Sequence, residues 1–198
     1  PSSFIYGGHE YDVVSIGDNA FNGCSGLTSI DIPQTVTEIG QSAFRDCESL
    51  ESVIIPSSVT EIGMWAFYGC SSLTSASILG TVSSIPSSLF RECASLESVV
   101  IPDGVTAIGA YAFYNCGELS SVDIPDSVES VENYAFWNCK SLDALVLPES
   151  LKTVGNDAFY GCSGVDELVL PSGLESVADN AFYGMRYLTS LEIPASLT

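Results

Sequence analysis

The sequence predicts a single α/β solenoid of about eight stacked coils, each roughly 23 residues long, and three observations carry this prediction. First, shifting the sequence against itself by one repeat, from Phe21 to Phe44, places eight of the nine phenylalanines in one column: Phe21, Phe44, Phe67, Phe90, Phe113, Phe136, Phe159 and Phe182. Second, the same shift aligns all seven cysteines, Cys24, Cys47, Cys70, Cys93, Cys116, Cys139 and Cys162, and Met185 takes the eighth place. Third, a period between about 20 and 50 residues is typical of solenoids, whose units are too small to bury an apolar face alone.

Each copy predicts the same series of elements, which the copy from Val36 illustrates. The stretch Ser52 to Ile55 alternates polar and apolar residues and predicts a short strand. A proline ends this strand in most copies, because proline has no amide hydrogen to donate to a ladder. A second extended piece and a glycine turn follow. The apolar residues from Ala43 to Leu50 then have the spacing of a short helix or 3₁₀ turn.

Two parts of the chain depart from this pattern. The fourth copy has Leu79 in place of the proline and Pro86 in place of the usual glycine, so we expect a local irregularity of the backbone there. Residues 1–12 match the repeat poorly, and we expect them to form a lead-in or cap in which Phe4 to Tyr6 make an edge strand over the first coil. The repeat domain is expected to cover 13–198, with an incomplete last repeat that indicates a piece of a longer chain.

Composition and charge exclude several classes of function. The chain has 25 acidic and 5 basic residues and a net charge of −20, while 46% of its residues are apolar. So few cations cannot form the basic stripe that neutralises phosphates, so nucleic acid is not an expected partner. The sequence also lacks an apolar run of the roughly 18 residues or more that a membrane-spanning helix needs, so direct membrane insertion is not expected either.

The cysteines and the single histidine predict no metal site and no catalytic centre. Cysteines that lie a full repeat apart do not form the close pairs of a zinc site, and Met185 in the same column indicates an apolar position. We therefore expect free buried thiols, with some disulfides as the alternative. His9 and Glu10 begin like a metalloprotease motif, but Val13 stands where the second histidine would be. No cofactor is predicted, and the chain is not expected to be an enzyme.

The repeat resembles the BspA-type (Treponema pallidum-type) leucine-rich repeat. The segments VTEIGQSAFRDCESLESVIIP and VTEIGMWAFYGCSSLTSASIL have its Ile-Gly, Ala-Phe, Cys and Leu positions, and the first ends in its Ile-Pro. The resemblance implies a right-handed superhelix with parallel strands on its concave face and short helix or 3₁₀ turns on its convex face. It also implies a surface or secreted protein that takes part in adhesion or partner binding, and it brings no catalytic residues.

Two surfaces are candidates for partner binding. We use "strand face" for the outward positions of the strands that end in the conserved proline, where short polar residues alternate with apolar footholds. The residues proposed there are Glu51, Ile54, Glu97, Val100, Asp123, Asp143, Val146 and Glu167. The second surface is an aromatic ridge on the opposite side, suited to stacking on sugars or anchoring a protein, or else only covering the gaps between turns. Its residues are Trp65, Tyr68, Tyr111, Tyr114, Tyr134, Trp137 and Tyr160.

The expected function is a non-catalytic interaction module of a cell-surface or secreted protein, which binds a protein or glycan ligand. Two alternatives remain: a rigid spacer within a long surface protein, and an accessory binding domain attached to an enzyme. The wide, acidic strand face is better suited to bind a macromolecule than to enclose a small molecule. The strand face can equally be a passively solvated sheet.

Overall fold

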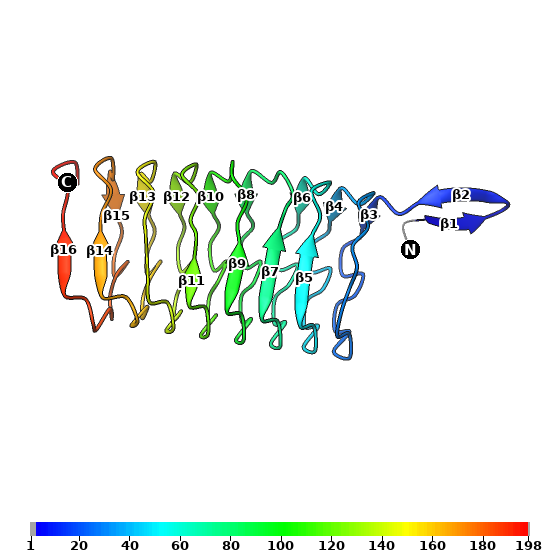
Figure 1. Ribbon diagram of the computed structural model, residues 1–198, viewed down its shortest axis with the longest axis horizontal. Helices are drawn as coiled ribbons and strands as arrows, with labels where there is room; N and C mark the ends of the chain where they lie inside the picture. Colours follow the sequence, from blue (N-terminus) through cyan, green and yellow to red (C-terminus); the bar gives the residue numbers. More distant parts are fainter. Residues whose placement is uncertain (1–2, 198) are drawn as a thin grey trace.

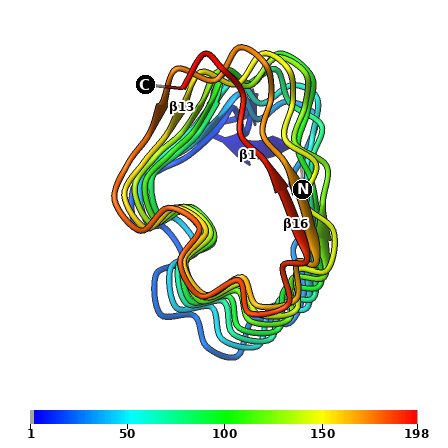
Figure 2. The ribbon, with the colours of Figure 1, turned by 90° about the vertical axis from the view of Figure 1, so that its left-hand side faces the viewer.

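The computed structural model describes residues 3–197, and it shows a β-solenoid of about eight coils (Figure 1). Seen along its axis, successive coils superpose as one closed loop (Figure 2). Residues at equivalent positions of neighbouring coils pair in register, as Ser52 does with Ser75 and Ile55 with Ile78. The predicted solenoid and its repeat length are therefore confirmed.

The strands before the proline positions, present in six coils, form one side of the solenoid and pair in parallel with their neighbours. The predicted strand Ser52 to Ile55 is observed with these bounds as β5. Residues 144–147 contribute no strand, and they divide this side into two ladders. The strands are β5 (Ser52–Ile55), β7 (Ser75–Ile78), β9 (Ser98–Val100), β11 (Ser121–Val122), β14 (Glu167–Val169) and β16 (Ser190–Glu192).

The second extended piece of each coil forms another parallel side, made of two-residue strands. Its two sheets meet between the third and fourth coils, where Pro86 stands in the glycine column. The strands are β3 (Ser15–Ile16), β4 (Glu38–Ile39), β6 (Glu61–Ile62), β8 (Ser84–Ile85), β10 (Ala107–Ile108), β12 (Ser130–Val131), β13 (Thr153–Val154) and β15 (Ser176–Val177).

The predicted helix or 3₁₀ turn is wrong: residues 3–197 contain no helix, and the third side of each coil is a series of turns. The reason lies in two backbone positions per coil that have positive φ. Ser42 and Asp46 have φ of 54° and 55°, and left-handed residues four apart cannot belong to one right-handed helix. Instead, the amides of Ser42, Phe44 and Asp46 donate to carbonyls of the next coil. Those of Ala43, Arg45 and Cys47 donate three residues back within their own coil.

The core is one continuous apolar spine in which the predicted columns lie in file. Six of the eight column phenylalanines, from Phe44 to Phe159, are fully buried. Neighbouring rings stack with centroids 4.9–5.8 Å apart. In this range offset-stacked rings attract one another beyond the burial of their area.

The irregularity expected in the fourth copy is present but small. The stacks of Phe90 on Phe67 and Phe113 are tilted by 19° each, the largest angle in the column. Pro86 has no amide hydrogen for the ladder that Gly63 and Gly109 join on either side. Leu79, in contrast, donates its amide to the carbonyl of Ile55 at 2.9 Å, a bond that the usual proline cannot make.

The lead-in does not form an edge strand over the first coil. β1 (Ser3–Tyr6) pairs antiparallel with β2 (His9–Asp12), and the two make a sheet of their own. This hairpin extends away from the coils (Figure 1). The turn at Gly7 and Gly8, both with positive φ, explains the difference because it lets β1 pair with β2 instead of with the first coil.

Candidate functional site

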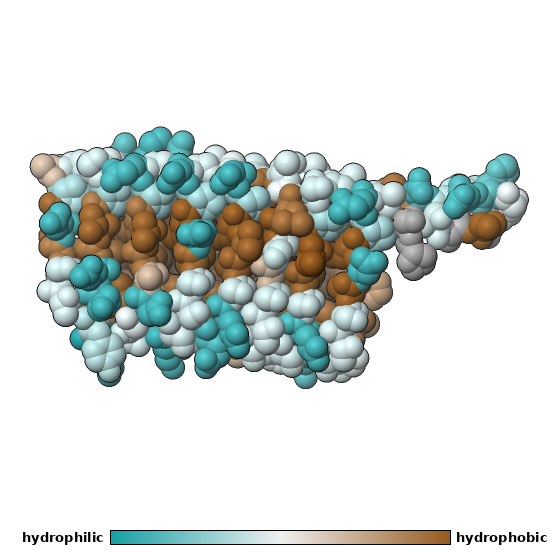
Figure 3. Space-filling model, in the orientation of Figure 1, coloured by the Kyte–Doolittle hydropathy of each residue, from teal (hydrophilic) through white to brown (hydrophobic). Residues whose placement is uncertain are grey.

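The strand face is the side of the molecule where apolar side chains reach solvent in a row. Ile54, Val100, Val146 and Val169 are 52–77% exposed, although their strand neighbours toward the core are buried. Figure 3 shows the resulting apolar band along this face, bordered by polar residues on both sides. The band follows one column of outward positions, which has a β-branched apolar residue in four coils. In the other four coils this position is Asp31, Ser77, Asp123 or Glu192.

Two shallow depressions lie side by side in the strand face. The first, of about 580 Å³, is lined by Val100, Val146 and the three acidic residues Asp103, Asp123 and Asp126. The second, of about 390 Å³, is lined by Asp143, Val146, Glu167 and Val169. They flank residues 144–147, which contribute no strand. The structure thus groups five of the eight predicted strand-face residues here, whereas Glu51, Ile54 and Glu97 lie outside both depressions.

The charge of the strand face has one sign. Its predicted carboxylates, at Glu51, Glu97, Asp123, Asp143 and Glu167, are all exposed. The five cations of the chain are Arg45, Arg91, Lys140, Lys152 and Arg186, and none of them lines either depression. Partner groups that reach this face would therefore meet apolar contacts within a field that favours cations.

Six of the seven predicted ridge residues form two stacked columns along the turns. The seventh, Trp65, is separated from Tyr111 by Ser88 and stacks on no ring of residues 3–197. The longer column runs Arg45, Tyr68, Arg91, Tyr114, Trp137, Tyr160 and Tyr183. Its guanidinium groups lie over the rings of Tyr68 and Tyr114 at 4.7 Å, and its rings then stack at 4.6–5.6 Å. The shorter column contains Tyr111 and Tyr134, stacked at 4.9 Å.

This stacking determines what the ridge can do. The faces of Tyr114, Trp137 and Tyr160 are covered by neighbours in the column, so their edges rather than their faces point to solvent. Cation–π and ring–ring contacts of this kind contribute to stability. The geometry favours the ridge as a covering of the turns.

The cysteine column consists of free thiols, of which six are buried and Cys24 is exposed. Each buried Sγ donates to the carbonyl oxygen of the phenylalanine 26 residues earlier, as from Cys116 to Phe90 at 3.1 Å. Burial raises the pKa of the Cys47 and Cys162 thiols from 9.0 to about 12. These sulfurs therefore stay protonated at neutral pH and do not act as nucleophiles or ligands.

We expect one thiol per chain to react quickly with Ellman's reagent in the native protein at pH 8, and seven after denaturation. The reason is that only Cys24 is reachable from solvent. The variant C24S should abolish the fast reaction and leave six thiols in the denatured count. A native protein in which several thiols react at the rate of Cys24 would contradict the burial of the column.

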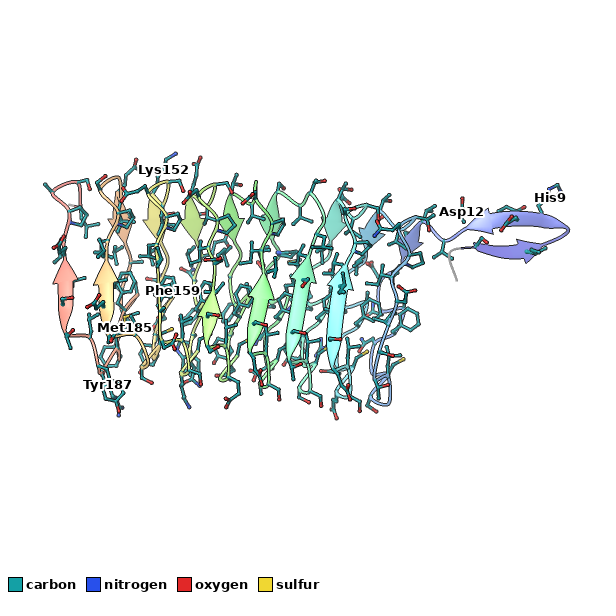
Figure 4. All side chains as sticks on the ribbon, in the orientation of Figure 1. His9, Asp12, Lys152, Phe159, Met185 and Tyr187 are labelled. Carbon is teal, nitrogen blue, oxygen red and sulfur yellow. The ribbon has the colours of Figure 1, made fainter. Side chains whose placement is uncertain are left out.

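The remaining candidate chemistry is not assembled by the fold. His9 lies on the exposed hairpin, apart from the coils (Figure 4). Within residues 3–197 no group of three or more histidine, cysteine or carboxylate side chains is placed to hold a metal ion. No helix in this range is long and apolar enough to cross a membrane.

The comparisons with known proteins agree with this geometry. The sequence model of the BspA type Leucine rich repeat region matches residues 14–143 and 83–198, with 6 copies. A leucine-rich repeat protein from Bacteroides ovatus is 34% identical with a TM-score of 0.72, over 98% of this chain and 56% of that one. The Treponema pallidum leucine-rich repeat protein is 36% identical with a TM-score of 0.75, over 83% of this chain and 75% of that one.

A leucine-rich repeat protein from Eubacterium ventriosum has the same fold at 22% identity and a TM-score of 0.64, over 81% of this chain and 50% of that one. A search of curated proteins gave no significant match. The chain thus spans about half of the Bacteroides ovatus and Eubacterium ventriosum proteins and three quarters of the Treponema pallidum protein.

Proposed function

We propose that this chain, which belongs to the BspA-type leucine-rich repeat family, is a non-catalytic interaction module that binds a protein partner through its strand face. The observation that carries the proposal is the row of exposed apolar residues, Ile54, Val100, Val146 and Val169, on a face without cations. Val146 and Val169 are neighbours in this row, and only Asp123 separates Val146 from Val100. Exposed apolar residues gathered on one face mark interaction sites.

The shape of the strand face favours a protein over a small molecule. Its two depressions are shallow and adjoin one another through Ala144 and Val146. A broad surface with apolar footholds within a polar rim is typical of protein–protein interfaces, in which a few central residues contribute most of the affinity. The carboxylates around the footholds favour a partner that carries lysine or arginine, because complementary charges speed association and select partners.

The test is a binding screen against purified extracellular proteins of both high and low isoelectric point. We expect at least one basic partner to bind, and the double variant V100S/V146S to weaken that binding about tenfold or more. Removal of two central apolar contacts typically weakens an interface by this amount or more. Surface plasmon resonance on the whole chain measures the change directly.

The matched control is M64S, which removes an exposed apolar side chain from another side of the coil. It should leave binding unchanged. A partner whose affinity fell equally in M64S and V100S/V146S would contradict the strand face as the site, and so would a partner indifferent to both variants.

The rigid-spacer alternative is favoured by a different observation. The phenylalanine column and the hydrogen bonds between coils are continuous along the chain, which makes the body stiff whether or not it binds anything. In that case every protein in the screen should fail to bind. The proposed interaction module and the spacer therefore predict opposite results in the same assay.

An extracellular or cell-surface location is part of this proposal. It is supported by the family, because the resemblance to it implies a surface or secreted protein. Fractionation of cells that produce the protein should find it in the envelope or the medium. Recovery from the cytoplasm alone would contradict this part of the proposal and leave the binding surface unaffected.

A further inference from the structure

Two of the five surface cations line a depression at one end of the aromatic ridge, where Tyr160 and Tyr183 also line it. The other three are ion-paired: Arg45 with Asp46, Arg91 with Glu92 and Lys152 with Glu129. Lys140 and Arg186 make no ion pair among residues 3–197, and both are exposed. Both line one depression of about 350 Å³. In a chain with a net charge of −20, two unpaired cations at one place favour an anionic ligand.

The composition of this depression differs from that of the two depressions in the strand face. No carboxylate lines it, whereas both depressions of the strand face include several. We call it the cationic hollow and define it by Lys140, Gly161, Tyr183, Gly184, Arg186 and Tyr187. Tyr187 lies at the lower edge of the last coils, whereas Phe159 lies in the interior (Figure 4).

The hollow forms where two consecutive coils both have glycine in one column, whereas Gly23 and Gly69 in the same column have Asp46 or Glu92 as neighbours. The column that contains Gly161 and Gly184 has Asp46, Glu92, Asn115 and Asn138 in other coils, and Asn138 and Asn115 hydrogen-bond there at 2.8 Å. All positions of this column have positive φ, a conformation that glycine and asparagine tolerate best. The nearest atom to a Cβ added at Gly161 would be Oδ1 of Asn138 at 3.6 Å, so the space above the ladder is open.

The wall of the hollow is aromatic and polar. Tyr187 is 70% exposed, and its column is otherwise filled by glycine, serine and Glu118. Tyr183 is 60% exposed, and Ser163 and Asn138 add a hydroxyl and an amide. Exposed tyrosine rings offer apolar faces to the C–H groups of a sugar, and the cations and polar groups offer hydrogen bonds to its acidic group and hydroxyls.

We propose that the cationic hollow is a binding site for an acidic sugar, a unit of a glycan that bears carboxylate or sulfate. Lys140 and Arg186 bind the acidic group, and Tyr187 packs against the sugar ring. The volume of about 350 Å³ is near the lower end of the range for small-ligand pockets. A long polyanion is repelled by the rest of the surface, so short oligosaccharides are the appropriate ligands.

The test uses trigalacturonate as the acidic probe and maltotriose as the neutral one, with the whole chain, in isothermal titration at about 0.1 M salt, where charges farther apart than about 10 Å are screened. We expect binding of trigalacturonate only. R186Q and K140Q should each weaken it about tenfold or more, because a hydrogen bond to a charged group typically contributes that much. K152Q, which removes the same charge away from the hollow, is the control and should have no effect.

Two further variants separate a sugar site from a place that holds any anion. G161N fills the hollow with the residue that two other coils have in this column, and it should abolish binding, whereas G23N makes the same change in an open part of the column and should not. Y187A should weaken trigalacturonate binding but leave any effect of inorganic sulfate unchanged. Trigalacturonate binding by Y187A as tight as that of the parent protein would overturn the proposal, as would full binding by G161N or equal binding of maltotriose. The strand-face variants V100S/V146S should not change this binding, so the two proposals succeed or fail separately.

Discussion

Replacing Phe113 by alanine is expected to lower the free energy of unfolding by about 3–5 kcal/mol, the usual loss when a fully buried phenylalanine is truncated. Phe113 has no exposed surface. Its ring stacks on Phe90 at 5.8 Å and on Phe136 at 4.9 Å. The neighbouring coils are held by their backbone ladders and cannot collapse into the space, so the cavity adds to the lost burial. Urea unfolding followed by circular dichroism measures the change.

The matched control is F21A in the same column. Phe21 is 37% exposed and stacks on a single ring, that of Phe44 at 5.2 Å. Its replacement should therefore lower the stability clearly less than F113A. Equal losses for the two variants would show that the column is not the continuous core described above.

Stability is also expected to fall steeply above pH 9, because the folded protein keeps thiols protonated that the unfolded chain releases. Burial raises the pKa of Cys47 and Cys162 from 9.0 to about 12, and it raises the pKa of Cys93, Cys116 and Cys139 as well. Below the unfolded pKa both states hold these protons and the thiols have no effect on the pH dependence. Above it the unfolded state binds fewer protons, so the free energy of unfolding decreases with pH.

The expected decrease is up to about 1.4 kcal/mol per pH unit for each such thiol, a large effect when five are summed. Urea unfolding between pH 7.5 and 10.5 under reducing conditions measures the slope. The double variant C116A/C139A should reduce that slope by up to two protons, and C24A, which changes the exposed thiol, should leave it as it is. An unchanged slope in C116A/C139A would contradict the burial of these sulfurs.

The core and the strands could be predicted from the sequence because both follow directly from the repeat. A column that is phenylalanine in every coil can face only one environment, and it is buried from Phe44 to Phe159. The strand Ser52–Ile55 follows from alternation and from the proline after it. These signals lie within one strand or recur with the repeat, so they can be recognised without knowing the path of the backbone around each coil.

The turns could be predicted only in part. The column of Asp46 is mostly glycine, asparagine and aspartate, the residues that tolerate positive φ, so its left-handed backbone could have been inferred. The column of Ser42 gives no such signal, because it contains Trp65, Tyr111 and Tyr134, which rarely adopt this conformation. Hydrogen bonds to the next coil hold them there, as from Tyr111 to the carbonyl of Asn133 at 3.0 Å. Tertiary bonding thus decides the backbone at these positions.

The candidate sites, too, could be predicted from the sequence only in part. The exposed row of Ile54, Val100 and Val146 was visible as a column of outward apolar residues, but the depressions around it depend on side-chain volumes in three coils at once. The cationic hollow was not predicted, although Lys140, Ser163 and Arg186 occupy one column. The sequence feature that indicates the hollow is glycine at both 161 and 184, close to Ser163 and Arg186. The hollow itself forms only when the coils stack.

Because hydrogen bonds of the same kind join every pair of neighbouring coils, the molecule can be lengthened or shortened by one whole coil at a time. Each interior coil is hydrogen-bonded to the one before it and the one after it, so a unit can be removed and its neighbours will meet with matching residues. Deleting 105–127 would join Gly104 to Val128, restoring the order proline, aspartate, small residue, valine that both junctions had. The body would shorten by one strand spacing, about 4.8 Å. Gene duplication or loss of such a unit therefore changes how far the molecule reaches without redesigning any interface.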